Sequence, residues 1–597
     1  MAVLVIQRRG QGMLGFPLQT VRAWHCALRR LLLALTLTLM TSGALAATPS
    51  LQLSGVDGEP RDNILAHVAI GNEPCELASW RERAMQRNAR RNADTALRAL
   101  GYYSPTLTTR LQRTDNCWTL DMQVTTGPRV TVSEVQMTVT GPAESDPAFR
   151  EVLANPALKA GDPLRHDRYE QMRNTLSRLA ADRGYFDSQM VAHRLEVDVP
   201  RQQARIVLHL DSGPRYRFGE VTLEQDVLHP ELAQRFIPFV PGDPYDSRQL
   251  INLQQSLNSS GYYGNVRIST EPDAQSRRVS VAATTTARAK HGYMAGIGFS
   301  TDIGPRLRLG YENRRVNRRG HRYSFEMEAS PVRSGAGFNY EIPIEPNREK
   351  VTFSAGYRDE ETDTSDSERY RLGVAHQLEL KSNWIATTSL EFEREYFTVA
   401  DVRDRTDLLM PGFELARTRG DHPVYPQHGW HLSGKVRFAE QALASSVTFV
   451  QFRGRAKLIF PLLGGRIISR ADAGVTEADE LVELPSSVRF FAGGDASVRG
   501  YAYESLGPTN DDGDVVGGRH LLTGSVEYDH LFLPSWSAAI FIDGGNAFDT
   551  LDTFEAVYGY GVGIRWRSPI GPIRLDVARP SDQRDEFRIH VSMGPDL

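Results

Sequence analysis

The second half of the chain alternates between apolar and polar residues, and this limits its fold more than any other feature. From about residue 291 helical periodicity disappears, and short alternating segments are separated by turn residues. A period of two places successive side chains on opposite faces of a β-strand. Sixteen strands are predicted, at 292–300, 305–313, 321–330, 336–344, 350–359, 369–380, 384–395, 408–419, 429–439, 446–462, 466–475, 520–533, 536–547, 558–568, 571–580 and 586–594.

The setting of these strands favours a membrane barrel over residues 291–597. Residues 1–46 are typical of an export signal, because an apolar run follows Arg29-Arg30 and an Ala44-Leu45-Ala46 cleavage site follows the run. No later stretch reads as an apolar helix of about twenty residues, so crossing a membrane would require a barrel. A soluble β-sandwich would alternate similarly, but the even strand count and the lack of a break into two sheets favour the barrel.

The first half of the chain contains a threefold repeat. Each unit reads as a strand, helices and two more strands, and a glycine that tolerates the left-handed conformation ends the helical part. The repeated motifs are Gly101-Tyr102-Tyr103, Gly184-Tyr185-Phe186 and Gly261-Tyr262-Tyr263, with Gly127-Pro128-Arg129 and Gly213-Pro214-Arg215 at the openings of units two and three. We therefore expect three α+β modules, at 47–127, 128–212 and 213–290.

The cysteine content and the net charge limit the classes of protein to which the chain can belong. Cys26 lies in the export signal, which leaves Cys75 and Cys117 in a compartment that permits disulfides. We predict that these two pair; the alternative is two buried free thiols. The formal net charge of −4 argues against a general nucleic-acid binder.

An arginine-rich helix in the first module is a candidate docking surface. Arg81, Arg83 and Arg87 are its first three arginines. They suit an acidic partner or anionic lipid headgroups, although a solvated helix face would have the same composition.

The repeats resemble polypeptide-transport-associated (POTRA) domains through their G-Y-[YF] and G-P-R-[VY] motifs. Such modules expose a strand edge that can pair with an extended peptide. Three modules acting as passive spacers are the alternative.

The barrel resembles the outer-membrane assembly superfamily that includes BamA, TamA and the two-partner-secretion transporters. The motifs that carry this resemblance are Phe491-Ala492-Gly493-Gly494 with Val498-Arg499-Gly500-Tyr501, Phe541–Asn546, Gly571–Asp576 and Asp421–Trp430. Three repeats and the ending Gly594-Pro595-Asp596-Leu597 are most similar to the TamA branch.

That branch implies an outer-membrane barrel with periplasmic POTRA domains and an inner-membrane-anchored, TamB-like partner. It also implies a role in inserting unfolded outer-membrane proteins such as autotransporters. Two alternatives stay open: a two-partner-secretion transporter that exports one substrate, and a role in lipid transport to the outer membrane.

A loop latch is predicted around Val498, Arg499, Gly500 and Tyr501. Strand parity turns Glu527 and Asp543 toward the lumen, because their neighbours Val526 and Ile542 mark the lipid face. An in-folded Arg499 would then meet both carboxylates, and the resemblance implies the pair with Asp543. The alternative is that Arg499 is simply solvated in the lumen.

A weak seam is predicted where the first and last barrel strands meet. The candidate residues are Gly292, Gly296, Gly298 and Gly594, since glycine weakens strand packing. Such a seam would open sideways and template an incoming strand. The alternative is that these glycines only shape a tight barrel.

No enzymatic motif is found. The sequence lacks G-x-S-x-G, H-E-x-x-H and a P-loop, so neither catalysis nor a cofactor is expected. His422, His428 and His431 cluster in a turn without a clear carboxylate shell, so no metal site is predicted there. A passive porin would not need three modules or an in-folded arginine loop.

Overall fold

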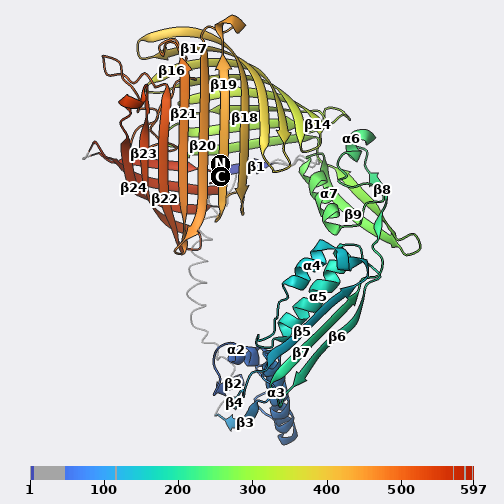
Figure 1. Cartoon of the computed structure of the whole chain (residues 1–597). Coiled ribbons are helices and arrows are strands. Elements are labelled where there is room, and N and C mark those ends of the chain that lie inside the picture. The colour runs from blue at the N-terminus through green and yellow to red at the C-terminus, as the bar shows by residue number, and fades with distance from the viewer. Residues whose placement is uncertain are drawn as a thin grey trace, which may run out of the picture.

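The computed structural model describes residues 2–5, 48–114, 117–568, 571–583, 586–594 and 596. Three small α+β modules lead from the N-terminal part of the chain to one end of a large barrel (Figure 1). The predicted fold class, three α+β modules followed by a sixteen-stranded antiparallel barrel, is confirmed. Most of the predicted export signal lies outside the described residues. Within the described part of the chain, no helix is both long and apolar enough to cross a membrane.

Each module is a three-stranded sheet whose first and last strands pair in parallel, packed against its helices. Module 1 contains β2 (Ser50–Ser54), α2 (Gly58–His67), α3 (Ser79–Ala99), β3 (Thr106–Arg113) and β4 (Trp118–Thr125). Module 2 contains β5 (Thr131–Thr140), η1 (Pro142–Ser145), α4 (Pro147–Ala154), α5 (His166–Asp182), β6 (Gln189–Asp198) and β7 (Gln203–Asp211). Module 3 contains β8 (Arg217–Glu224), α6 (Pro230–Gln234), α7 (Ser247–Ser259), β9 (Tyr263–Asp273) and β10 (Arg278–Ala287).

Each of the three modules has its own apolar core. Leu97 and Trp118 belong to the first core, Leu176 and Ile206 to the second, and Phe218 to the third. In module 1 a disulfide adds a covalent tie between Cys75 and Cys117.

The repeated motifs join each module to the next. Arg129, from the opening of module 2, donates through Nε to the main-chain oxygen of Leu100 at 2.7 Å, at the end of α3. Its guanidinium also lies 5.6 Å from the ring centroid of Tyr102. This arginine therefore satisfies a free helix-end carbonyl of the preceding module while contacting its aromatic ring.

The second joint repeats both contacts, and the joint to the barrel repeats only the arginine over the ring. Arg215 donates to the main-chain oxygen of Arg183 at 2.9 Å and lies 5.6 Å from the ring of Tyr185. At the barrel, the arginine over the ring is Arg322, 5.4 Å from Tyr262. The G-Y-[YF] and G-P-R motifs therefore form the two joints between modules, and the third G-Y-Y motif contacts the barrel.

An ion bridge between modules 2 and 3 provides a first prediction. Arg183 binds the carboxylate of Asp146 through two nitrogens, at 3.0 and 3.1 Å, and that of Asp246 at 2.8 Å. Burial raises the pKa of Asp146, but hydrogen bonds and charge from Arg183 outweigh it and hold that pKa below its usual value. We expect Arg183→Ala to broaden the distribution of distances between spin labels on modules 2 and 3 at neutral pH.

The matched control for this joint is Arg173→Ala, whose ion pair with Glu170 stays within α5. Because the Asp146 pKa is depressed in the folded chain, its contribution is present at neutral pH. It is lost only as the pH falls below about 4, the usual carboxylate range. An unchanged distance distribution in Arg183→Ala would show that the bridge does not hold the joint.

The barrel strands follow one another around the sheet, each antiparallel to its neighbours. They are β11 (His291–Ser300), β12 (Gly304–Asn313), β13 (Arg322–Ala329), β14 (Arg333–Glu345), β15 (Glu349–Glu361), β16 (Ser365–Glu379), β17 (Ile385–Val399), β18 (Val402–Gly420), β19 (Gly429–Ala439), β20 (Phe449–Leu462), β21 (Gly465–Ala478), β22 (His520–Leu533), β23 (Trp536–Phe548), β24 (Val557–Ser568), β25 (Gly571–Pro580) and β26 (Arg588–Met593). The described connections include the short 3₁₀ helices η2 (Gln441–Leu443) and η3 (Leu551–Thr553).

The predicted strands differ from the observed ones mainly in length. β17 runs to Val399 and β18 begins at Val402, whereas the predicted bounds were 395 and 408. The start of β18, residues 403–407, carries polar residues on both faces, so the apolar alternation is lost there while the hydrogen-bonded ladder continues. At the end of β17 the buried residues are the apolar Phe397 and Val399.

Candidate functional site in the barrel lumen

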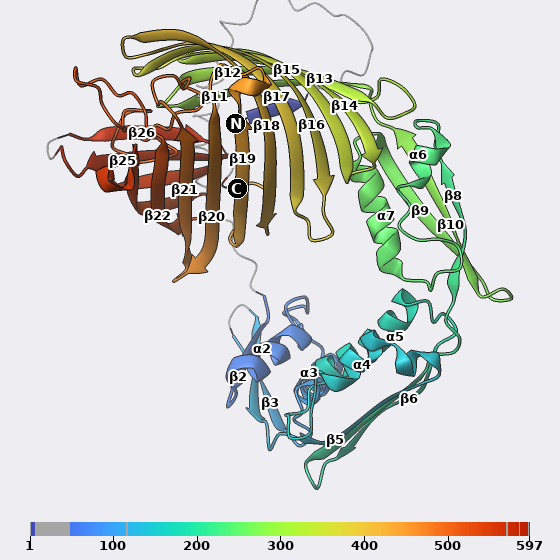
Figure 2. The same cartoon turned by 45° about the horizontal axis from the view of Figure 1, so that its top comes forward.

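Loop 6, residues 479–519 between β21 and β22, packs inside the barrel. Val498, Arg499 and Tyr501 are buried, with at most 6% of each side chain exposed. Bridges between Phe490 and Gly518 hold the base of the loop together. Figure 2 shows the barrel wall as one curved sheet that surrounds this region.

Arg499 forms the centre of a buried charge cluster. Its Nε and Nη2 atoms lie 2.7 and 2.9 Å from the two carboxylate oxygens of Asp543, a bidentate pair. Its Nη1 lies 2.8 Å from Glu527 Oε2. The guanidinium carbon is 3.4 Å from the ring centroid of Phe541, which covers its flat face. The structure thus brings Arg499 together with both carboxylates predicted for it.

Two members of the cluster were missed from the sequence. Asp576 on β25 accepts a hydrogen bond from Arg499 Nη1 at 3.1 Å. Arg565 on β24 lies 2.9 Å from Glu527 Oε1 and 2.5 Å from Asp576 Oδ1. The same strand parity, applied to β25 and β24, turns Asp576 and Arg565 toward the lumen. We call Arg499, Glu527, Asp543, Arg565 and Asp576 the latch cluster.

The latch cluster is nearly balanced in charge. Three carboxylates face two guanidinium groups, and Arg470 adds a third, 3.7 Å from Asp543. A buried charge is costly unless it is paired and hydrogen-bonded, so the removal of one partner disturbs the remaining ones. The arrangement is suited to holding loop 6 in one position on the wall formed by β22 to β25.

A glycine in β24 makes room for the loop. A Cβ atom at Gly559 would lie 1.7 Å from the main-chain oxygen of Arg499, far inside the van der Waals distance. The absence of a side chain there allows the two backbones to meet.

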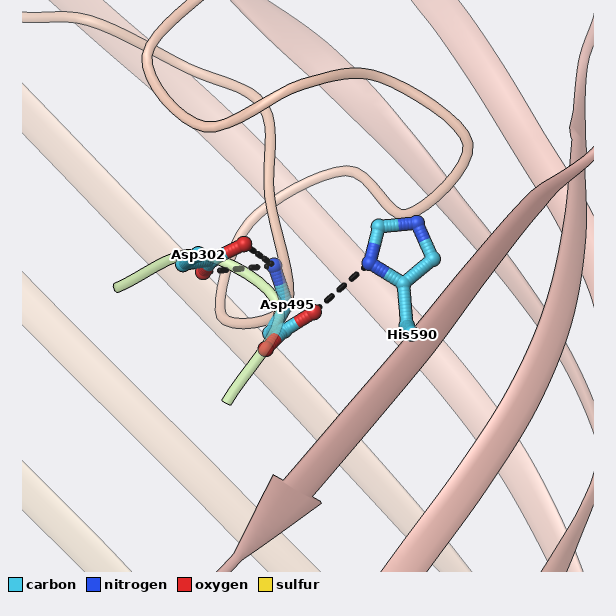
Figure 3. Close-up of side chains that lie close together, drawn as sticks. All are labelled: Asp302, Asp495 and His590. Carbon is cyan, nitrogen blue, oxygen red and sulfur yellow. Dashed lines mark hydrogen bonds and ion pairs between the residues drawn. The ribbon is translucent and has the colours of Figure 1, made fainter. Parts of the chain in front are cut away.

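The loop also contacts the last strand. Gly500 donates its main-chain N–H to Nε2 of His590 on β26 at 2.9 Å, and Tyr501 donates its hydroxyl to Asp582 at 2.6 Å. His590 in turn contacts Asp495 of loop 6, whose main-chain N–H meets the carboxylate of Asp302 (Figure 3). Burial and the neighbouring Asp495 carboxylate raise the pKa of Asp302, in the β11–β12 turn, to about 7.

The turn motif Asp421–Trp430 anchors the opposite end of the barrel. Tyr425 donates its hydroxyl to Asp529 at 2.8 Å, and its ring lies 3.4 Å from the guanidinium carbon of Arg466. The three histidines in and beside this motif have separate partners: His422 accepts from the main-chain N–H of Tyr425, His428 lies 3.4 Å from Asp421 Oδ2, and His431 pairs with Thr418.

The first and last barrel strands meet without a hydrogen-bonded ladder among the described residues. Among those residues the two strands are joined where Thr301, directly after β11, donates its main-chain N–H to the main-chain oxygen of Val591 in β26 at 3.1 Å and accepts from the main-chain N–H of Val591 through Oγ1 at 3.2 Å. Gly292, Gly296 and Gly298 lie on β11 beside this seam, and Gly594 directly follows β26. The other partner of β11 is a short strand, β1 (Ala2–Val5), from the segment predicted to be the export signal.

The predicted docking arginines lie on α3 of module 1. Arg81, Arg83 and Arg87 are all exposed, and Arg81 forms an ion pair with Glu73 at 3.0 Å. Trp80, 68% exposed, lies beside them. The placement leaves this face accessible, and its docking role stays a prediction.

Three protein-family models match parts of the chain. Residues 256–596 match the Omp85 superfamily domain, residues 50–126 match the POTRA domain TamA domain 1, and residues 216–286 match the surface antigen variable number repeat.

Among relatives, the chain is 23% identical over 422 residues to outer envelope protein 80, chloroplastic, of Arabidopsis thaliana, covering 61% of this chain and 54% of that one. It is 21% identical over 377 residues to outer membrane protein assembly factor BamA of Nitratidesulfovibrio vulgaris, covering 59% and 48%. The chain thus spans about half the length of these relatives.

A crystal structure of BamA from Haemophilus ducreyi lacking POTRA domains 1–3 shares the fold. Its TM-score is 0.61 at 16% sequence identity, and the match covers 78% of this chain and 99% of that one.

Proposed function

The chain belongs to the Omp85 superfamily, and on that premise we propose that it is a non-enzymatic assembly factor that inserts or translocates β-barrel proteins such as autotransporters. Membership in the superfamily implies that the barrel lies in the outer membrane. In this proposal the three modules extend into the periplasm, where they meet unfolded substrates.

The observation that carries this proposal is the asymmetry of the barrel wall. β22 to β25 are joined by hydrogen-bonded ladders and tied to loop 6 by the latch cluster, whereas β11 and β26 share no ladder among the described residues and meet through Thr301 and Val591. An unpaired strand edge is a template for another strand. The rigid side would keep the barrel closed while the seam pairs with the substrate.

The edge of β11 is able to pair in this way. Residues 2–5 form an antiparallel ladder with Ile297, Gly296, Ala295 and Met294. Because this segment belongs to the predicted export signal, its removal would leave the edge free for a substrate strand.

Module 1 is the proposed contact for a TamB-like, inner-membrane-anchored partner. The match to a TamA first POTRA domain supports this role. The exposed face of α3 with Arg83 and Arg87 would dock an acidic surface of that partner.

The seam is tested by a covalent tether. We expect the double variant Thr301→Cys/Val591→Cys, once oxidised, to lose most substrate insertion into liposomes and to recover it on reduction. The reason is that the linked backbones can no longer separate. Insertion is measured as the fraction of a radiolabelled substrate barrel that becomes protease-resistant.

The control tether is Ser324→Cys/Asn339→Cys, which joins directly opposed residues of β13 and β14 that already form a ladder. Insertion should be the same in both redox states of this variant. Full insertion by the oxidised seam variant would contradict the proposal.

A further inference from the structure

Loop 6 meets both sides of the seam at one acidic junction. Asp302 comes from the β11–β12 turn, Asp495 from loop 6 and His590 from β26 (Figure 3). One possible ligand atom from each of the three residues lies within 4.8 Å of the others. No metal site was predicted from the sequence, in which these three residues are almost three hundred positions apart at the extremes.

The hydrogen bonds of His590 fix its role at the junction. Its Nε2 lies 2.9 Å from the main-chain N–H of Gly500 and therefore accepts a hydrogen bond. The proton of the neutral ring is then on Nδ1, which donates to Asp495 Oδ1 at 2.6 Å. Both ring nitrogens are occupied, so His590 orients Asp495 and is not itself available as a metal ligand.

The two carboxylates are left without a cationic partner among the described residues. The side chain of Asp495 is 10% exposed, and its Oδ2 is buried without a hydrogen-bond partner. Arg470 is close, but it donates to the main-chain oxygen of Asp495 at 3.3 Å and not to the carboxylate. The carboxylates of the latch cluster pair with arginines, whereas the carboxylates of Asp302 and Asp495 do not.

We propose that Asp302 and Asp495 bind a hard divalent cation of the calcium class, with His590 as a positioning residue. Carboxylate oxygens are the ligands that such cations prefer, and two ligands on opposite sides of a calcium ion are about 4.6–5.2 Å apart. The lack of a free imidazole nitrogen or thiolate disfavours zinc. Waters would complete the coordination.

The ion would tie loop 6 to the turn that ends β11, next to the contact between Thr301 and Val591. A bound divalent cation would therefore strengthen the contact that joins the end of β11 to β26. The binding site stands on its own geometry, whereas its effect on substrate insertion rests on the proposed function.

Calorimetric titration of Ca²⁺ into the full-length protein, refolded in detergent and freed of chelator, tests the site. We expect one Ca²⁺ per chain, an affinity at least tenfold lower in Asp302→Asn and in Asp495→Asn, and no competition by equimolar Zn²⁺. Asp512→Asn, an exposed carboxylate of the same loop, is the matched control and should bind as the unaltered chain does.

Wild-type thermal unfolding provides a second measurement that does not depend on the variants folding. Added Ca²⁺ should raise the unfolding midpoint, and a chelator should reverse the rise. Absence of binding, or equal binding by Asp302→Asn, would overturn the proposal. A midpoint that responds to pH but not to Ca²⁺ would also overturn it, since the carboxylates would then share a proton. Binding without an effect on substrate insertion would leave the site intact and count against the proposed function alone.

Discussion

We expect Arg499→Ala to release loop 6 from the barrel wall and to abolish most substrate insertion, while the barrel itself still folds in the membrane. Arg499 pairs with three carboxylates of the latch cluster, and 4% of it is exposed. Removing one partner of a buried ion pair costs about 3–5 kcal/mol, because it leaves uncompensated charge behind. Arg565 still pairs with Glu527 and Asp576, so the main loss falls on Asp543.

Protease cleavage in loop 6 measures the release, and heat-modifiable electrophoretic mobility shows whether the barrel is folded. Arg499→Lys should recover only part of the function, because a single ammonium cannot reproduce the bidentate pair with Asp543. Arg455→Ala is the control, since its side chain is 55% exposed and its nearest carboxylate atom, on Asp472, is 3.6 Å away. Normal insertion with a protected loop in Arg499→Ala would rule out the latch.

The second large effect is expected from Gly559→Ala. The new methyl group would overlap the main-chain oxygen of Arg499, at 1.7 Å, so loop 6 could not dock without displacing β24 or its own backbone. We expect the loop to become protease-sensitive as in Arg499→Ala, although every charge of the latch cluster is retained. This separates the steric requirement of the latch from its electrostatic one.

Gly524→Ala on β22 is the matched control for the steric variant. A Cβ atom there would come no closer than 3.7 Å to its nearest neighbour, the main-chain oxygen of Arg470, which is ordinary contact. Loop protection and substrate insertion should therefore match those of the unaltered chain. A protected loop in Gly559→Ala would mean that the loop docks differently from the arrangement described.

Local periodicity made much of this protein predictable from its sequence. The strand period of two determines which side chains face the lumen, so Glu527 and Asp543 could be assigned inward before any fold was known. Their neighbours Val526 and Ile542 are indeed about half exposed on the outer face. The repeated glycines and G-P-R motifs likewise located the three modules, because helix ends and module joints depend on local conformation.

Parity gives the face of a strand but not the distance between two side chains. Asp576 and Arg565 belong to the latch cluster because the register of β22, β23, β24 and β25 places their inward side chains at the same level of the barrel wall. The start of β18 at residue 402 was also misplaced, since the ladder persists there through residues that are polar on both faces.

What the sequence by itself determined was therefore the architecture and the inward set of residues, because both follow from short-range periodicity. Tertiary structure alone decided which of those residues meet. Asp302, Asp495 and His590 come together because the barrel brings its first and last strands side by side and folds loop 6 against them. No pattern within a single strand carries that information, since it depends on the closure of the whole sheet.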